Sequence, residues 1–143
     1  MRIAIASDHA AVELRQLLAA RLAELGHEVD DLGCQPGERV DYPRYAAAVS
    51  GAIIQGNAER GVLVCGTGIG MSIAANKIAG IRAALVHDVT TARLAAEHNA
   101  ANVLCLGGRV LGPLVAQECL EIWLQTTFDP RHQHRLDLIT AME

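Results

Sequence analysis

The feature that most constrains the fold is the alternation of short, mostly apolar segments with longer segments of helical periodicity. Short apolar runs bounded by polar or glycine residues are typical of buried strands. Strands that alternate with helices form a parallel sheet with helices on both faces. The segments expected as strands are Ile3–Ser7, Glu28–Leu32, Val62–Cys65, Ala83–His87 and Val103–Leu106.

The segments between these strands have helical spacing. The clearest is Ala10–Leu25, where five leucines fall on one stripe and charged residues face away from it. Gly26 supplies a stop for this helix, and Gly112-Pro113 supplies a start for a later one. The fold class predicted is α/β, a Rossmann-like three-layer sandwich with a five-stranded parallel sheet. The expected helices are Ala10–Leu25, Tyr45–Gln55, one beginning near Met71, Val89–Glu97, Leu114–Thr126 and, beyond the sheet, Arg131–Met142.

Length and composition indicate one folded domain over residues 1–143. With 51% hydrophobic and 20% charged residues, the chain can bury a core and is not of the disordered class. The net charge of -4 and the lack of a basic run argue against nucleic acid as a partner. No apolar run approaches the roughly 20 residues that cross a bilayer, so no membrane is expected. The chain opens on a strand-like segment without a signal peptide, and the cytoplasm is the expected location.

The cysteines and histidines show no metal-binding spacing. The cysteines form no CxxC pair, and in a reducing cytosol we expect free thiols that are mostly small buried hydrophobes. His132-Gln133-His134 is too short and isolated to hold a metal ion, so no metal and no other cofactor is expected. The four cysteines are Cys34, Cys65, Cys105 and Cys119.

Polar and glycine residues follow the predicted strands. Parallel strands end at a common edge, where ligands of such sheets bind. We therefore expect these residues to gather at one edge: Asp8 and His9, Cys65 with Gly66–Gly70, His87 and Asp88, and Gly107–Arg109.

The segment Gly66–Gly70 has the spacing GxGxG, which fits neither the dinucleotide fingerprint nor the P-loop. Glycines let backbone N–H groups converge on an anion at the start of a helix. The segment therefore predicts a cradle for a phosphate or a developing oxyanion, the alternative being a tight turn without a ligand. Cys65 directly precedes it, where N–H groups favour a thiolate that acts as nucleophile or base, the alternative being a buried strand-end cysteine.

These segments belong to a longer pattern that runs from end to end. Cys65–Gly70, Ser72–Lys77 and Gly80–Ala83 resemble the signature of type B ribose-5-phosphate isomerases, whose superfamily includes galactose-6-phosphate and allose-6-phosphate isomerases. One branch uses the cysteine before the loop as base, and the other a glutamate after it. Met71 occupies the glutamate position, so the chain resembles the cysteine branch. Further matches are Ser7–His9, Asp41–Pro43, Glu97–Asn99, Asn102–Leu104, Gly108–Val110 and Arg131–Arg135, and a departure is Asp129-Pro130, where some relatives carry a glycine pair.

The resemblance implies a cofactor-free aldose–ketose isomerase that interconverts D-ribose 5-phosphate and D-ribulose 5-phosphate through a cis-enediolate, in the non-oxidative branch of the pentose phosphate pathway. Cys65 would be the base, His98 the acid that opens the furanose ring, and Thr67 a hydrogen-bonding partner of the migrating hydroxyl region. The substrate-binding residues implied are Asp8, His9, Tyr42, Gly66, Gly68, Ile69, Gly70, Asn99, Arg109, Arg131 and Arg135.

Arg131 and Arg135 are four residues apart, so a helix places both on one face. Guanidinium groups suit a phosphate dianion, although most such pairs are solvated surface charges. The resemblance implies a homodimer with active sites shared between subunits, and dimers can pair further. Besides a second copy, the expected partner is a phosphorylated sugar. We expect His87, His132 and His134 to be surface or supporting residues.

Three alternatives remain at this point. A six-carbon sugar phosphate, allose 6-phosphate or galactose 6-phosphate, needs the same base and cradle and differs only in pocket depth. A non-enzymatic, phosphate-binding module of flavodoxin-like type would keep the glycine segment without needing Cys65 and His98 together. An inactive subunit of a hetero-oligomer is the third alternative, and the intact Cys65 argues against it.

Overall fold

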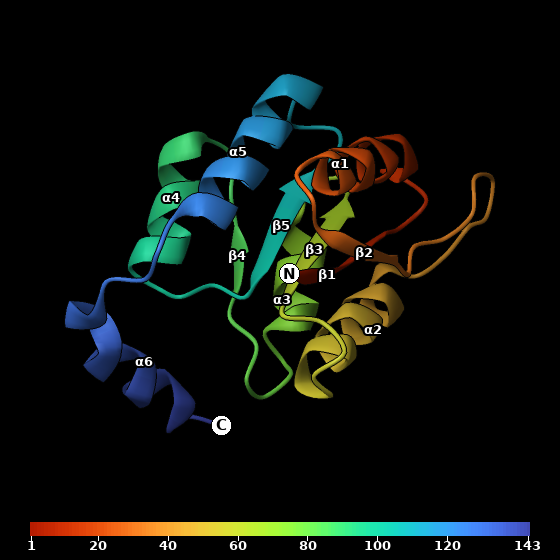
Figure 1. Cartoon of the computed structure of the whole chain (residues 1–143). Helices are drawn as coiled ribbons and strands as arrows, with labels where there is room; N and C mark the ends of the chain where they lie inside the picture. The colour runs from red at the N-terminus through yellow and green to blue at the C-terminus, as the bar shows by residue number, and fades with distance from the viewer.

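The computed structural model describes all residues from Met1 to Glu143 and contains one five-stranded sheet. The strand order is β2-β1-β3-β5-β4, and every neighbouring pair is parallel (Figure 1). The predicted α/β sandwich is confirmed. The strands are β1 (Arg2–Ser7), β2 (Glu28–Asp31), β3 (Arg60–Cys65), β4 (Ala83–Leu85) and β5 (Val103–Gly107).

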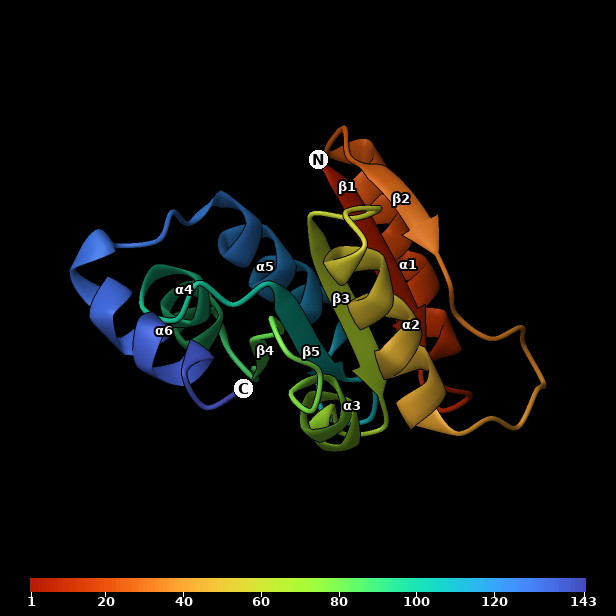
Figure 2. The same cartoon turned by 90° about the horizontal axis from the view of Figure 1, so that it is seen from below.

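Helices cover both faces of the sheet. Helices α1, α4 and α5 pack on one face, and α2 and α3 pack on the other. Helix α6 lies beyond β4, the edge strand of the sheet, and away from the carboxyl ends of β3 and β5, where α3 lies (Figure 2). None of the helices combines the length and apolarity needed to cross a bilayer. Their bounds are α1 (Val12–Glu24), α2 (Tyr42–Ile54), α3 (Ile69–Ala75), α4 (Val89–Glu97), α5 (Pro113–Gln125) and α6 (Gln133–Thr140).

The three central strands supply the core on both faces. Alternate residues of a strand point to opposite faces. On β3, Val62 and Val64 therefore join the cluster under α1, α4 and α5, while Leu63 and Cys65 join the cluster under α2 and α3. This alternation directs the Cys65 side chain toward α3.

Helix ends explain two differences from the sequence prediction. Strand β4 stops at Leu85 rather than His87, because the chain soon turns into α4, whose N-cap Asp88 accepts a hydrogen bond from the Thr91 N–H at 2.8 Å. Helix α2 begins at Tyr42 rather than Tyr45, with a proline in its first turn, where proline is tolerated.

The prediction of a single helix over Arg131–Met142 is wrong. A short 3-10 turn, Pro130–His132, precedes α6, so Arg131 and Arg135 do not lie on one α-helical face. The Asp129 carboxylate caps the 3-10 turn by accepting from the Arg131 N–H at 3.0 Å. Arg131 therefore lies in the 3-10 turn, whereas Arg135 lies in α6.

Trp123 on α5 is the largest fully buried side chain, and its indole N–H donates to the Ala101 carbonyl at 3.0 Å. We predict that Trp123→Ala lowers the free energy of unfolding by about 3–5 kcal/mol, because it leaves a cavity and an unpaired carbonyl. Urea denaturation measures the change. Leu114→Ala on the same helix is the control, since Leu114 is 66% exposed. Equal losses from both variants would contradict this account of the core.

Candidate active site

Cys65 ends β3, the strand between β1 and β5, and its side chain is only 5% exposed. The Gly68 backbone N–H donates to the Cys65 sulfur at 3.1 Å. An N–H donor stabilises negative charge on the atom that accepts from it. The sulfur therefore lies where a thiolate has a fixed hydrogen-bond partner.

The turn from β3 to α3 has no space for a side chain at Gly68 or Gly70. Gly68 has a positive φ of 79°, and a Cβ there would lie 2.6 Å from Leu85 and 3.0 Å from the Leu106 carbonyl carbon. A Cβ on Gly107 would lie 2.8 Å from the Thr67 backbone. The Tyr42 ring fills the space beside Gly70 in the same way, 2.7 Å from an added Cβ. These contacts fix the path of the turn and the direction of its N–H groups.

Several predicted residues surround this turn. Asp8 is 7% exposed, its N–H donates to the Val64 carbonyl at 3.2 Å, and its carboxylate accepts from the Ala10 N–H at 3.0 Å. Arg109 extends over Gly66, with its Cδ 3.5 Å from the position of an added Cβ. Thr67 is exposed, and its hydroxyl accepts from the Ile69 N–H at 3.3 Å.

His9 and Ile69 lie on the exposed side of this edge. The His9 Nδ1 atom lies 3.3 Å from the Val40 N–H, which fixes the ring against the loop before α2. Ile69 is 50% exposed at the start of α3. The structure therefore brings together, at the carboxyl edge of the sheet, Asp8, His9, Tyr42, Cys65, Gly66, Thr67, Gly68, Ile69, Gly70 and Arg109.

The other three cysteines are free and buried, in settings that oppose ionisation. Burial raises the pKa of Cys34 and of Cys105, and it raises the pKa of Cys119 to about 11. Cys65 alone among the four receives a hydrogen bond from the glycine turn. No three His, Cys, Asp or Glu side chains come close enough to hold a metal ion.

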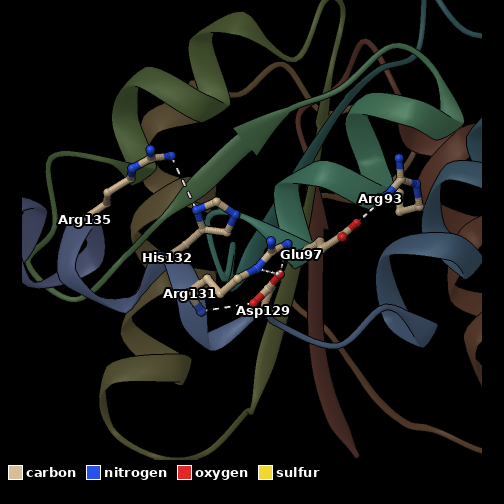
Figure 3. Close-up of polar contacts among 6 residues, drawn as sticks. All are labelled: Arg93, Glu97, Asp129, Arg131, His132 and Arg135. Atoms are coloured by element: carbon tan, nitrogen blue, oxygen red, sulfur yellow. Dashed lines mark hydrogen bonds and ion pairs between the residues drawn. The ribbon is translucent and has the colours of Figure 1, made fainter.

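A second group of predicted residues lies at the opposite edge. His98 is the C-cap of α4, and its ring centroid lies 4.4 Å from that of His132. Arg135 Nη1 lies 3.3 Å from His132 Nδ1, within hydrogen-bond distance, and Arg131 forms an ion pair with Asp129 at 2.6 Å (Figure 3). This group extends from the end of α4 to the start of α6.

Charge and burial shape this second group. Partial burial lowers the pKa of His132, and the neighbouring His98 and Arg135 lower it further. Hydrogen bonds from Arg131 lower the pKa of Asp129 to about 2, so this carboxylate is ionised at neutral pH. The cluster therefore holds two guanidinium groups and two imidazoles beside one carboxylate.

The two groups are not adjacent within one chain. Strand β5 runs from Val103, paired with Gly61, to Gly107, paired with Cys65, which spans roughly 13 Å at about 3.3 Å per residue. Asn99 precedes β5, and its carbonyl accepts from Arg82, the residue before β4. His98, Asn99, Arg131 and Arg135 are thus at the amino edge, away from Cys65.

The sequence interpretation missed two structural residues of the amino edge, Arg82 and Asn102. The Asn102 side-chain oxygen accepts from the Arg82 N–H at 2.8 Å, and its side-chain N–H donates to the Gly80 carbonyl at 2.8 Å. Arg82 and Asn102 lie in segments that matched the family pattern, Gly80–Ala83 and Asn102–Leu104, but their pairing could not be inferred from sequence alone.

Comparison with known proteins supplies the decisive observation. Residues 3–139 match the family described as Ribose/Galactose Isomerase. The chain belongs to this family. Ribose-5-phosphate isomerase B of Escherichia coli is 44% identical over 99% of this chain and 96% of its own length. The ribose-5-phosphate isomerase B structure from Clostridium thermocellum is 43% identical, with a TM-score of 0.97 over 99% of this chain and 97% of that one.

The ribose/galactose isomerase family also contains relatives named for other substrates. The galactose-6-phosphate isomerase subunit LacB of Clostridium acetobutylicum is 38% identical over 94% of this chain and 78% of its own length. The resemblance and the isomerase class predicted from the sequence are confirmed, and the non-enzymatic alternative is set aside.

We predict that Gly68→Ala lowers kcat by about 10²-fold or more, because the added Cβ displaces the N–H that faces the Cys65 sulfur. Steady-state kinetics measures the loss. Gly26→Ala is the control: Gly26 also has a positive φ, of 82°, but nothing lies within 4 Å of its added Cβ. This control should lose stability and keep its rate. A Gly68→Ala enzyme with unchanged kcat would show that the turn geometry is unimportant.

Proposed function

We propose that this chain interconverts D-ribose 5-phosphate and D-ribulose 5-phosphate through a cis-enediolate, with Cys65 as the base. The observation that carries the proposal is the hydrogen bond from the Gly68 N–H to the Cys65 sulfur, at a glycine with no space for a side chain. The proposal also draws on Met71 in the position where the glutamate branch carries its base.

The reaction moves two protons and changes no net oxidation state. The Cys65 thiolate removes the proton from C2 of the open-chain aldose, and the electron pair of that bond forms the C1–C2 double bond of the enediolate. Negative charge that develops on O1 is stabilised by N–H groups of the glycine turn. The Cys65 thiol then returns its proton to C1, while the proton of O2 passes to O1, assisted by the Thr67 hydroxyl. Acid–base groups suffice for each step, so no cofactor is required.

Ring opening and phosphate binding fall to the second group of residues. His98 would donate a proton to the ring oxygen of the furanose and accept the proton of the anomeric hydroxyl. Arg131 and Arg135 would hold the phosphate by charge-assisted hydrogen bonds, with Arg109 and His9 approaching from the carboxyl edge. Asp8, Tyr42 and Asn99 would contact the sugar.

Because the two groups lie at opposite edges of one sheet, we propose a homodimer in which each site takes Cys65 from one subunit and His98 from the other. Exposed apolar residues support a second copy as the occupant of this surface. Helix α3 exposes Ile69 and Ile73 at 50% and 57%, and α6 exposes Leu138 and Ile139 at 63% and 40%. Association would bury this apolar surface, which is a favourable contribution to dimer formation.

A six-carbon sugar phosphate is the second candidate substrate, favoured by the relative named as a galactose-6-phosphate isomerase subunit. Initial rates with ribose 5-phosphate, allose 6-phosphate and galactose 6-phosphate at equal concentration separate the candidates. The proposal expects the highest kcat/KM for ribose 5-phosphate. A higher value for either hexose phosphate would reassign the substrate but keep the chemistry.

We predict that Cys65→Ser lowers kcat by about 10²–10⁴-fold, because a serine hydroxyl is nearly isosteric with a thiol but is a far poorer proton acceptor at neutral pH. A coupled isomerase assay measures the rate, and circular dichroism checks the fold. Cys119→Ala is the matched control, a buried cysteine on α5 outside the proposed site. Turnover at the wild-type level in the Cys65→Ser enzyme would remove Cys65 from the mechanism.

Subunit mixing tests the shared site. Cys65→Ser and Arg135→Ala enzymes are each expected to have low activity, but hybrids contain one site with both residues intact. We predict that mixing under exchange conditions restores up to half of the wild-type rate per hybrid dimer. Native mass spectrometry confirms that hybrids form. No gain above the separate variants, with hybrids present, would place both residues in a site within one chain.

A further inference from the structure

Ala100 adopts a backbone conformation that alanine disfavours. It is the one non-glycine residue of the chain with a positive φ, at 44°. Its turn ends α4 directly after His98 and Asn99, where the Ala100 N–H donates to the Ala96 carbonyl at 3.1 Å and the Ala101 N–H donates to the Ala95 carbonyl at 2.9 Å. Helices usually end this way on glycine or asparagine. Something other than residue preference must hold this turn.

The Arg82 guanidinium supplies that restraint. Its Nε donates to the Asn99 carbonyl at 3.2 Å and to the Ala100 carbonyl at 3.1 Å, and its Nη2 donates to the Ala100 carbonyl at 2.9 Å. The backbone of Arg82 is itself fixed, because its N–H donates to the Asn102 side chain at 2.8 Å and its carbonyl accepts from the Asn102 N–H at 3.1 Å. The guanidinium therefore reaches the turn from a rigid base at the start of β4.

Electrostatics suits a cation at this place. Arg82 forms no ion pair, whereas Arg93, Arg131 and two other arginines each pair with a carboxylate. Its charge faces carbonyl groups at the C-terminal end of α4, where the helix dipole is negative. The Arg82 guanidinium thus donates to backbone carbonyls of the turn rather than to an acidic side chain.

We propose that Arg82 is a positioning residue, which holds the turn at Ala100 so that His98 and Asn99 are directed at the sugar. The proposal rests on the proposed function, in which His98 opens the ring. His98 is well placed to respond, because it is the C-cap of α4, two residues before Ala100, and its ring lies beside that of His132. Without the guanidinium, Ala100 would relax toward a negative φ and the two side chains before it would turn away.

The test compares Arg82→Met, the double variant Arg82→Met/Ala100→Gly, and Arg2→Met. Arg2 is a matched control, because it also donates to the carbonyl of a left-handed residue, Gly56, at 2.9 Å, but it is the first residue of β1 and lies far from His98 in the sheet order. Glycine adopts a positive φ without cost from a Cβ, so the double variant should recover the turn without the arginine. Three readouts are measured: the kinetic constants kcat and KM for ribose 5-phosphate, the NMR signal of the His98 imidazole, and the free energy of unfolding.

We expect Arg82→Met to lower kcat at least tenfold, with KM changed less than threefold, and to shift the His98 signal. The double variant should recover most of kcat and the original signal, and Arg2→Met should change neither. Equal kcat losses in Arg82→Met and Arg2→Met, or a double variant that regains stability but not kcat, would leave Arg82 a purely structural role and overturn the proposal. The NMR readout does not depend on the substrate: an inactive wild-type enzyme with the expected signals would refute the proposed function alone.

Discussion

The lack of space at the turn between β3 and α3 determines much of this structure. Leu85 and the Leu106 backbone leave no space for a Cβ at Gly68, and the Thr67 backbone leaves none at Gly107. This close packing restricts the path of the turn. That path directs the Gly68 N–H at the sulfur of Cys65. The close approach depends on β3 and β5 pairing in register, with Cys65 opposite Gly107. The core of the sheet and the environment of the thiol are therefore parts of one packing arrangement.

The path of the chain divides the functional residues into two groups. Helices that follow parallel strands run back to the amino edge, so α4 carries His98 away from the edge where Cys65 lies. The segment Asp129–Arg135 meets His98 at that far edge. If two copies associate so that the carboxyl edge of one faces the amino edge of the other, each site is complete. This division gives a physical reason for proposing assembly, beyond the exposed apolar residues of α3 and α6.

The sequence predicted the sheet, the helix order and the members of the carboxyl-edge group, because these depend on local periodicity and on the rule that parallel strands end together. It did not predict that β4 stops at Leu85 or that Arg131 precedes α6 in a 3-10 turn, since the caps at Asp88 and Asp129 decide these boundaries through single hydrogen bonds. The contacts of Arg82 with the turn at Ala100 could not be predicted either. A positive φ at alanine contradicts residue preference, and the guanidinium that contacts this turn comes from a residue distant in sequence.

The central claim is that Cys65 carries a proton between C2 and C1 through an enediolate. Isomerisation of ribose 5-phosphate in deuterium oxide tests it most directly, because a proton held on a thiol can exchange with solvent deuterium before it returns to carbon. NMR or mass spectrometry of the ribulose 5-phosphate should reveal deuterium at C1 in the wild-type product, and no incorporation above background with the Cys65→Ser enzyme. Deuterium incorporation by the Cys65→Ser enzyme at the wild-type rate would show that another group carries the proton and would contradict the account.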